Sequence, residues 1–511
     1  MISRGRCGRT IGILLAALLS GVCGAQKDGL SNNPILPGDH PDPTIIRVGT
    51  TYWTASTSGD WAPVFALYRS TDLHHWTAAG SIFPHSPAWV QGSFWAPELV
   101  SDRGRVLVYY VGRKRGGPLC VAVATAANPA GPYEDHGPIM CEADGSIDPA
   151  FVRDEMGKPF LIWKEDGNSQ RQPTRIWAQP LTTDLVQVTG EKTQLMVNDA
   201  QSWEGGVIEA PYILRHAGKF YMFYAGNACC GVACHYAEGV ARADRLLGPW
   251  TRDPTNPIIA ANDAWRCPGH GTAVETPSGR DLFLYHAYPA SGTMYLGRES
   301  VMDSIAWKVD GWPVVNGGRG PGVAQGDGGA APAFADAFAG TMLNAAWRWP
   351  VGHEPRVVVG AGKLTLSVPE GAAQAFVAQS LLTATYMATV GVMAGDGGLG
   401  LIGDAQDDVV LSRRTDGVEL WQLSNAGKRT IWKQGLNLNL DEKVWLRVAS
   451  TKKGEARFSY RVGDGEWRAA GESIELQSLL PWDSGLRVGL VVEGAHGGSA
   501  KFVRFAVGAA E

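Results

Sequence analysis

Residues 146–165 read SIDPAFVRDEMGKPFLIWKE, and residues 40–56, about a hundred positions earlier, read HPDPTIIRVGTTYWTAS. Both segments contain Asp-Pro, apolar residues, an arginine, a glycine and then a run of aromatic and β-branched residues. A glycine between two such runs is typical of a β-hairpin. Because the pattern occurs twice, it predicts a fold built from repeated hairpins.

Alignment of these segments identifies three further copies. The first residues of the five copies lie 54, 52, 62 and 60 positions apart, and each copy has a glycine seven to nine residues further on. The copies begin at Asp42, Ala96, Asp148, Ala210 and His270. Hairpins at this spacing, with no amphipathic helix between them, predict a five-bladed β-propeller. An ordinary β-sandwich with similar hairpins is the alternative.

The composition divides the rest of the chain. Residues 1–25 have three arginines, an apolar run and then small residues, which is typical of a secretory signal peptide. We therefore expect a secreted or periplasmic protein without a membrane span, whose propeller covers residues 26–315. Residues 316–332 are glycine-rich and predict a linker. Residues 333–511 alternate strand-like segments with turn signals, which predicts a β-sandwich of the jelly-roll type. The predicted fold class is all-β.

Charge and cysteine content limit the partners. The net charge is −5, or −8 without the three leader arginines, which argues against a nucleic-acid partner. Beyond the leader, an even number of cysteines in an exported chain predicts disulfides of unknown pairing. Free thiols are an alternative, as is a metal site in the cluster around residues 229–235. The cysteines concerned are Cys120, Cys141, Cys229, Cys230, Cys234 and Cys267.

The repeats differ in the residue at their first position. In a propeller the innermost strands point at the central axis, so equivalent residues of different blades converge on one cavity. Asp42 and Asp148 occupy this position, Glu209 lies one residue before it and Glu98 two residues after it. A carboxylate near the axis costs desolvation energy unless it is paired or used, although Asp before Pro also simply opens turns. Several carboxylates in one cavity favour glycoside hydrolysis, which needs an acid and a base or nucleophile.

The series HPDPTIIR, SFWAPELV, GSIDPAFVRDEMGKPFLIW, IEAPYILRHAGKFYMFYAG and CPGHGTAV, closing with YLGRESVMDSIAWKVDGWP, resembles glycoside hydrolase family 43 over roughly residues 33–315. The resemblance implies an inverting mechanism in which Asp42 is the general base and Glu209 the general acid. It further implies that Asp148 tunes the pKa of the acid and orients it. Glu209 is one residue out of register with the aspartates, so we expect a β-bulge to re-aim it. Asp39 is a rival to Asp42 but has no counterpart in the repeat.

Other residues are expected to bind the substrate. Among nineteen tryptophans, Trp95 is a candidate platform for a sugar ring. His270 in GHG and Arg298 in YLGR resemble family positions near the sugar. The His270 position faces an ion in some members, so a structural calcium near His270 is an alternative to a site that needs no cofactor and no metal. Glu98 is expected to be structural. The insertion NACCGVACHYAEGVARA departs from the common pattern and leaves the subfamily open.

The last part of the chain, with FADAFAGTMLNAAWRWP, GKLTLSV, VWLRVAS and SGLRVGLVVEG, resembles the concanavalin-like β-sandwich of some family xylosidases and arabinofuranosidases. There it packs on the propeller and narrows the pocket; alternatively it binds carbohydrate separately. The sequence thus predicts a secreted inverting glycoside hydrolase that releases arabinofuranose or xylose from plant polysaccharides or oligosaccharides. The alternatives are an endo-arabinanase with an open groove and a carbohydrate-binding propeller without catalysis.

Overall fold

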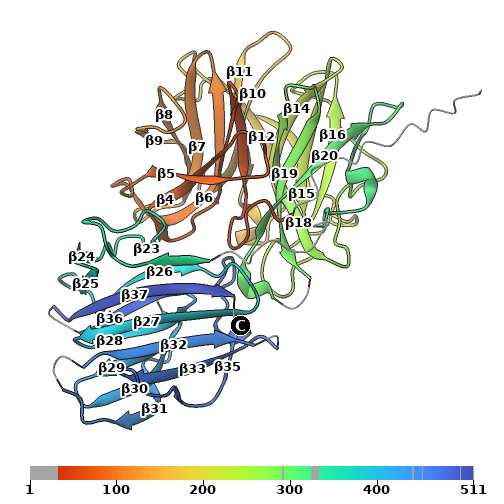
Figure 1. Cartoon of the computed structure of the whole chain (residues 1–511). Helices are drawn as coiled ribbons and strands as arrows, with labels where there is room; N and C mark the ends of the chain where they lie inside the picture. Colours follow the sequence, from red (N-terminus) through yellow and green to blue (C-terminus); the bar gives the residue numbers. More distant parts are fainter. Residues whose placement is uncertain are drawn as a thin grey trace, which may run out of the picture.

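The computed structural model describes residues 33–290, 293–323, 333–404, 406–439, 442–451, 453–494 and 497–509. The expected signal peptide lies outside the described residues, as does part of the expected linker. The chain forms five four-stranded sheets, two larger sheets and a two-stranded pair (Figure 1). No helix in the described ranges is long and apolar enough to cross a membrane. The predicted all-β class is confirmed.

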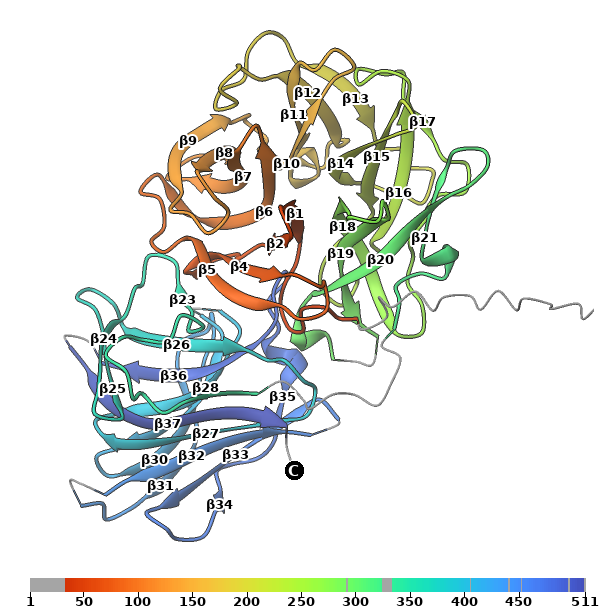
Figure 2. The same ribbon diagram turned by 45° about the horizontal axis from the view of Figure 1, so that its top comes forward.

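The five four-stranded sheets are the blades of a propeller, and Figure 2 shows them arranged around a common centre. Blade 1 consists of β1 (Thr44–Val48), β2 (Thr51–Ala55), β4 (Val64–Ser70) and β5 (Thr77–Phe83). Blade 2 consists of β6 (Val90–Asp102), β7 (Arg105–Lys114), β8 (Leu119–Ala126) and β9 (Glu134–Met140). Blade 3 consists of β10 (Ser146–Arg153), β11 (Pro159–Glu165), β12 (Arg175–Pro180) and β13 (Thr193–Val197).

Blade 4 consists of β14 (Ile208–His216), β15 (Lys219–Gly226), β16 (Ala237–Ala243) and β17 (Thr251–Arg252). Blade 5 consists of β18 (Trp265–Glu275), β19 (Asp281–Pro289), β20 (Glu299–Trp307) and β21 (Pro313–Val315). Short 3₁₀ turns are η1 (Gly167–Gln170), η2 (Met294–Leu296) and η3 (Asn316–Gly318). In each blade the strands are hydrogen-bonded in chain order, so each blade is a simple antiparallel meander.

Each repeat forms the first hairpin of its blade, as the sequence predicts. The first residue of every repeat has a positive φ, between 43° and 55°, which is uncommon outside glycine. In blades 2 to 5 the pairing of the first two strands shifts register there, forming a β-bulge. In the last copy Gly271 stands where the others have proline, because a Cβ there would lie 2.3 Å from the backbone oxygen of Leu284.

The ring is closed by the segment before β1, which runs along blade 5. The backbone N–H of Ile35 donates to Ser300 O at 2.9 Å, and that of His40 donates to Arg298 O at 2.9 Å. The side chain of Asn33 donates to Met302 O at 3.1 Å. These bonds place the segment that leads to Asp42 beside the strand that follows Arg298.

Two packed sheets follow the propeller. The nine-stranded sheet consists of β22 (Phe334–Asp336), β24 (Arg356–Gly360), β25 (Lys363–Ser367), β27 (Tyr386–Ala394), β32 (Val444–Ser450), β33 (Glu455–Val462), β34 (Arg468–Ala469), β35 (Ile474–Glu475) and β37 (Ser499–Ala509). The six-stranded sheet consists of β26 (Gln374–Ser380), β28 (Gly397–Ile402), β29 (Asp408–Arg414), β30 (Gly417–Leu423), β31 (Arg429–Gly435) and β36 (Arg487–Glu493). Aliphatic and aromatic residues of both sheets form one buried core, so the unit is a β-sandwich.

The sandwich is attached to the propeller by backbone pairing as well as by side chains. β3 (Trp61–Ala62) pairs with β23 (Trp349–Pro350), and the backbone N–H of Leu486 donates to Tyr295 O at 2.8 Å. Arg487 lies over the ring of Trp61, 4.2 Å from its centroid, and its Nη2 lies 3.4 Å from Oδ2 of Asp39. The junction therefore contains a buried ion pair.

Replacing Arg487 with Met should destabilise the protein by about 3–5 kcal/mol, because it leaves the buried Asp39 carboxylate without its cation. Urea denaturation measures this change. The control is Arg457→Met, since Arg457 is exposed on β33. An Arg487 variant as stable as this control would show that the ion pair does not hold the junction together.

Candidate active site

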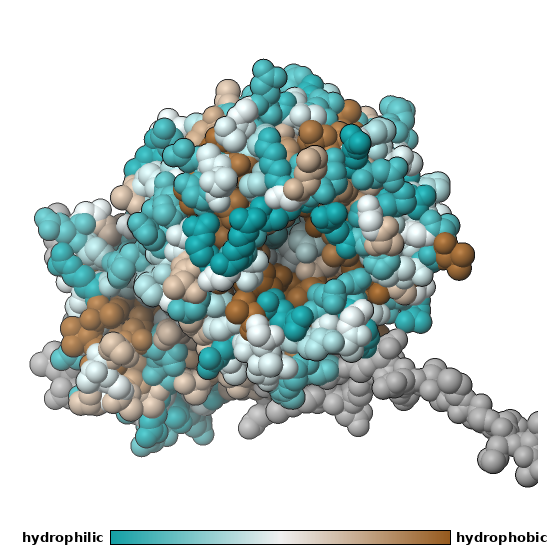
Figure 3. All heavy atoms as spheres, turned by 90° about the horizontal axis from the view of Figure 1, so that it is seen from above, coloured by the Kyte–Doolittle hydropathy of each residue, from teal (hydrophilic) through white to brown (hydrophobic). Residues whose placement is uncertain are grey.

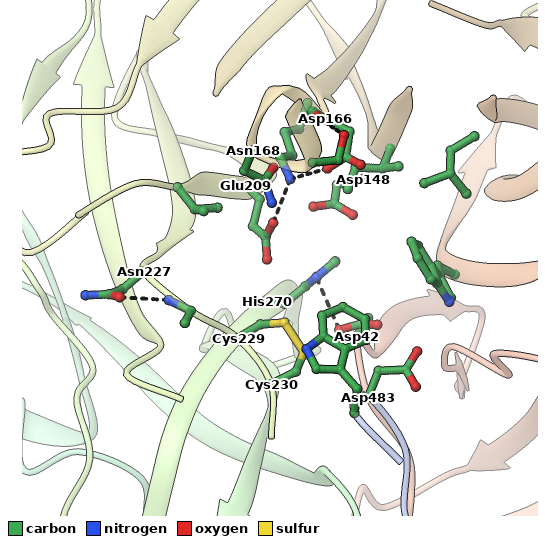
Figure 4. Close-up of a pocket in the computed structure, with 18 of the residues that line it drawn as sticks. Asp42, Asp148, Asp166, Asn168, Glu209, Asn227, Cys229, Cys230, His270 and Asp483 are labelled. Carbon is green, nitrogen blue, oxygen red and sulfur yellow. Dashed lines mark hydrogen bonds and ion pairs between the residues drawn. A yellow bond between two sulfur atoms is a disulfide. The ribbon is translucent and has the colours of Figure 1, made fainter. Parts of the chain in front are cut away.

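A pocket of about 480 Å³ lies at the centre of the propeller. Figure 3 shows the hollow from above, and Figure 4 shows the side chains that line it. The six residues expected to take part in catalysis or substrate binding all line this pocket: Asp42, Trp95, Asp148, Glu209, His270 and Arg298. They come from all five blades, so the repeat brings them together as expected.

A β-bulge explains how Glu209 joins the two aspartates although it is one residue out of register. The pairing of β14 with β15 shifts between Glu209 and Tyr212, as the sequence led us to expect. Ala210, which follows Glu209, donates its backbone N–H to Oδ2 of Asp148 at 2.9 Å. The bulge therefore turns Glu209 into the pocket and ties its strand to Asp148.

Asp42 is surrounded by cationic and imidazole groups. Its Oδ1 lies 3.0 Å from Nη1 of Arg298, 3.3 Å from Nδ1 of His270 and 3.2 Å from Nδ1 of His286. Burial opposes ionisation of Asp42, but Arg298 and the two histidines outweigh it and hold the pKa of Asp42 well below its usual range. Asp42 is therefore a carboxylate at any pH near neutral. Burial lowers the pKa of His286 to about 4, so this residue is neutral there.

Glu209 has two hydrogen-bond donors. Lys164 Nζ donates to Oε2 of Glu209 at 2.9 Å, and the Tyr236 hydroxyl donates to Oε1 at 2.8 Å. Lys164 also donates to Oδ1 of Asp166 at 2.9 Å, so it bridges two carboxylates. Burial opposes ionisation of Glu209, but the charge and hydrogen bond of Lys164, together with Tyr236, lower the pKa of Glu209.

The pKa of Asp148 shifts in the opposite direction to that of Glu209. Burial raises its pKa to about 6; His270 and Lys164 oppose this shift, while the charge of Glu209 adds to it. The two carboxyls titrate as a pair that holds one proton below about pH 6, and that proton sits with Asp148. The pKa shifts of the two carboxyls are therefore opposite in direction, upward for Asp148 and downward for Glu209. The reason is Lys164, which the sequence analysis did not include.

The family model for glycosyl hydrolases family 43 matches residues 31–313. The chain belongs to this family. A xylosidase/arabinosidase from Butyrivibrio fibrisolvens is 28% identical over an alignment of 311 positions that covers 57% of this chain and 57% of that relative. An extracellular exo-α-(1→5)-L-arabinofuranosidase from Cellvibrio japonicus is 27% identical over 54% of this chain and 86% of its own length. The chain thus spans little more than half the length of the first of these relatives.

Solved family 43 structures share the fold over both domains. The crystal structure of a xylan β-1,4-xylosidase from Bacillus halodurans is 21% identical and covers 93% of this chain and 99% of its own, with a TM-score of 0.79. The BlXynB protein from Bacillus licheniformis is 22% identical, and the match covers 94% of this chain and 99% of that protein, with a TM-score of 0.75. The arrangement of propeller and sandwich is therefore shared with family 43 proteins of low sequence identity.

In this family 43 chain the sandwich contributes to the pocket wall. Trp482 and Asp483, which lie between β35 and β36, line the pocket together with the propeller residues. Arg298 Nη2 donates to the backbone oxygen of Asp483 at 3.0 Å. Of the two roles considered for this domain, narrowing the pocket therefore has direct structural support.

Two of the remaining carboxylates lie outside the pocket. Asp39, the rival to Asp42, lies at the domain junction beside Arg487. Glu98 lines a small cavity of about 10 Å³ that shares Asp42, Asp148 and His270 with the pocket, and it accepts a hydrogen bond from Thr44 at 3.2 Å. Burial raises the pKa of Glu98 to about 8, so it is protonated at neutral pH. Neither Asp39 nor Glu98 lines the pocket that contains Asp42.

The surroundings of His270 do not fit a calcium site built from protein ligands. Calcium takes six to eight oxygen ligands, several of them carboxylates. Within the part of the chain that the structure describes, no group of three or more His, Cys, Asp or Glu side chains is placed to hold a metal ion. The ion near His270 stays a prediction.

The six cysteines beyond the leader form three disulfides, as predicted. They are Cys120–Cys141, Cys229–Cys230 and Cys234–Cys267. The cluster at 229–234 is therefore oxidised and has no free thiolate to offer a metal. The second disulfide joins neighbouring residues, and both of its cysteines line the pocket.

Replacing Lys164 with Met should raise the pKa of Glu209 above the ordinary value of 4.5, because the nearest cation is removed from a buried carboxylate. Carboxyl carbon chemical shifts followed by NMR titration measure this change. The control is Lys158→Met, since Lys158 is exposed at the other end of the same hairpin. A Glu209 pKa that stays low in the Lys164 variant would assign the effect to other neighbours.

Proposed function

We propose that the chain is an exo-acting, inverting glycoside hydrolase that removes terminal arabinofuranose or xylose from plant polysaccharides or oligosaccharides. The proposal is carried by one pocket that contains Asp42, a carboxyl whose pKa lies well below its usual range, and a separate pair, Asp148 and Glu209, whose pKa values shift in opposite directions. In Figure 4 His270 stands between Asp42 and this pair. Inversion needs a base and an acid on opposite sides of the glycosidic bond, with room for a water beside the base.

Each residue then has a defined task. Asp42 takes a proton from the water whose oxygen attacks the anomeric carbon, and its low pKa keeps it ready over the whole working range. Glu209 receives the proton of the pair from Asp148 and gives it to the leaving oxygen as the glycosidic bond breaks. Asp148 stores the proton of the pair next to Glu209. After release Asp42 loses its proton to solvent and the pair regains one, so the enzyme returns to its starting state.

Lys164 sets the condition under which Glu209 acts as an acid. Its ammonium group stabilises the Glu209 carboxylate, which favours proton loss to the substrate and disfavours reprotonation. Trp95, His270 and Arg298 line the same pocket and would hold the terminal sugar. The names of the relatives, which include both xylosidase and arabinofuranosidase, support a pentose in this position.

The closed side of the pocket supports exo action over endo action. An endo-arabinanase needs an open groove, whereas Trp482 and Asp483 of the sandwich stand at one side of this pocket. Three disulfides support an oxidising compartment, and hence a secreted or periplasmic protein. The net charge of −5 agrees with a neutral sugar substrate.

Release of pentose from 4-nitrophenyl α-L-arabinofuranoside or β-D-xylopyranoside tests the function, because activity on one of them selects the sugar. Glu209→Gln keeps the side-chain size but has no acidic proton. It should lose about a hundredfold or more on an oligosaccharide and less on the nitrophenyl substrate, whose leaving group needs little protonation. The control is the exposed Glu191→Gln. If neither glycoside is cleaved, cleavage of linear arabinan would indicate an endo-acting enzyme, and binding without cleavage a carbohydrate-binding protein.

The pH dependence follows from the two opposite pKa shifts. Because the pKa of Asp148 is raised to about 6, the pair keeps its proton below that pH and loses it above. We therefore expect kcat/KM to fall as the pH rises through about 6, while the low pKa of Asp42 keeps the acidic limb below the ordinary carboxyl range. In Asp148→Asn the basic limb should move to lower pH, since Glu209 alone titrates with a lowered pKa. If the basic limb of the pH profile does not move in this variant, it reports the titration of another group.

A further inference from the structure

The loop that carries Cys229 and Cys230 lies directly beside Glu209. Glu209 pairs with Ala225 in β15, and the loop begins two residues later, at Asn227. Cys229 and Cys230 are joined by a disulfide, and both line the pocket (Figure 4). Two sulfur atoms are thus placed at the substrate cavity, next to the residue assigned as the acid.

Other contacts already hold this loop in place. The backbone N–H of His235 donates to Ala228 O at 2.9 Å and closes the base of the loop. The Cys234–Cys267 disulfide fixes its far end to β18, and Gly231 N–H donates to the Tyr288 hydroxyl at 3.4 Å. The loop is therefore anchored at its base, its tip and its end.

A gain in folding stability does not explain a disulfide between two adjacent residues. A disulfide stabilises a fold mainly by closing a loop in the unfolded chain, and the effect grows with the length of that loop. Cys229 and Cys230 are adjacent and enclose no loop. What the bond does change is the surface: two thiols that donate hydrogen bonds and ionise become one fixed, apolar and polarisable pair of sulfur atoms.

A second apolar group stands next to this surface. The side chain of Trp482 is 64% exposed, which is unusual for a tryptophan, and it lines the same pocket. A Cβ added to Gly231 would lie 3.6 Å from the backbone oxygen of Trp482 and 3.9 Å from Cδ1 of its ring. The sulfur pair and the indole thus belong to one apolar edge, whereas Lys164, Asp166 and Asn168 make the lining on blade 3 polar.

We propose that the Cys229–Cys230 disulfide is a substrate-positioning surface that packs against the sugar unit on the leaving side of the scissile bond. The proposal rests on the proposed function, because the leaving oxygen must reach Glu209. The sugar that carries this oxygen then passes the loop that continues from the Glu209 strand pair. A sugar ring offers C–H groups on its faces, and these suit an apolar sulfur wall through close dispersion contacts.

The test compares the full chain with the double variant Cys229→Ser, Cys230→Ser on the pentose oligosaccharide that the wild type cleaves. We expect KM to rise about tenfold, equivalent to about 1.4 kcal/mol, with kcat within about twofold. The inhibition constant of the free pentose should not change, because it reports the terminal-sugar position. The matched control is Cys120→Ser, Cys141→Ser, which removes a disulfide whose sulfurs do not line the pocket.

Three results would overturn the proposal: an unchanged KM, an inhibition constant that rises as much as KM, or an equal effect in the control. Thermal unfolding of each variant shows whether it folds, and the free-pentose constant measures the pocket of a destabilised variant directly. If the wild type cleaves no pentoside, the proposed function fails by itself. The affinity for the oligosaccharide, measured by calorimetry, then tests the proposed contact between the disulfide and the sugar. A tenfold weaker affinity in the double variant supports the contact, and an equal affinity overturns it.

Discussion

The left-handed backbone at the first residue of each repeat is the constraint on which the rest of the structure depends. Such a conformation costs roughly 1–2 kcal/mol at a residue other than glycine. The chain nevertheless adopts it five times, because it bends each innermost strand where the strand reaches the axis. The backbone demand is the same in all blades, so the side chain at this position is free to vary. Alanine fills it in two blades, while aspartate or histidine fills it where the pocket needs a charge or a proton acceptor.

Carboxylates gathered at an axis must be neutralised or protonated, and the blades solve this in two ways. Around Asp42 the neighbouring blade supplies Arg298 and two imidazoles, which favour the charged form. Around Asp148 burial prevails, and the group keeps its proton up to about pH 6. One repeated position thus yields one carboxyl with a lowered pKa and one with a raised pKa. The difference arises from what the adjacent blade contributes and not from the aspartate itself.

The propeller could be predicted from the sequence because its repeat is local. A strand, a glycine turn and a second strand can be recognised within twenty residues. The sequence also predicted that Asp42, Asp148 and Glu209 lie in one cavity, because equivalent residues of propeller blades meet at the central axis. Lys164 and His286 were missed although both interrupt apolar strands, in FLIWKE and LFLYHAY, which is a readable sign of a buried polar group. The pairing of the cysteines and the position of Trp482 at the pocket had no such sign in the sequence. They depend on loops and on a second domain whose docking no local pattern specifies.

That docking reaches Asp42 through the side chain of Arg298. Arg298 holds Oδ1 of Asp42 with Nη1 at 3.0 Å and the backbone oxygen of Asp483 with Nη2 at 3.0 Å. Because a guanidinium group is planar and rigid, the two contacts fix each other's direction. Asp39, which is hydrogen-bonded to the backbone of Arg298, is in turn paired with Arg487 of the sandwich. The orientation of Asp42 is therefore set jointly by both domains, and the sandwich shapes the pocket as well as packing against the propeller.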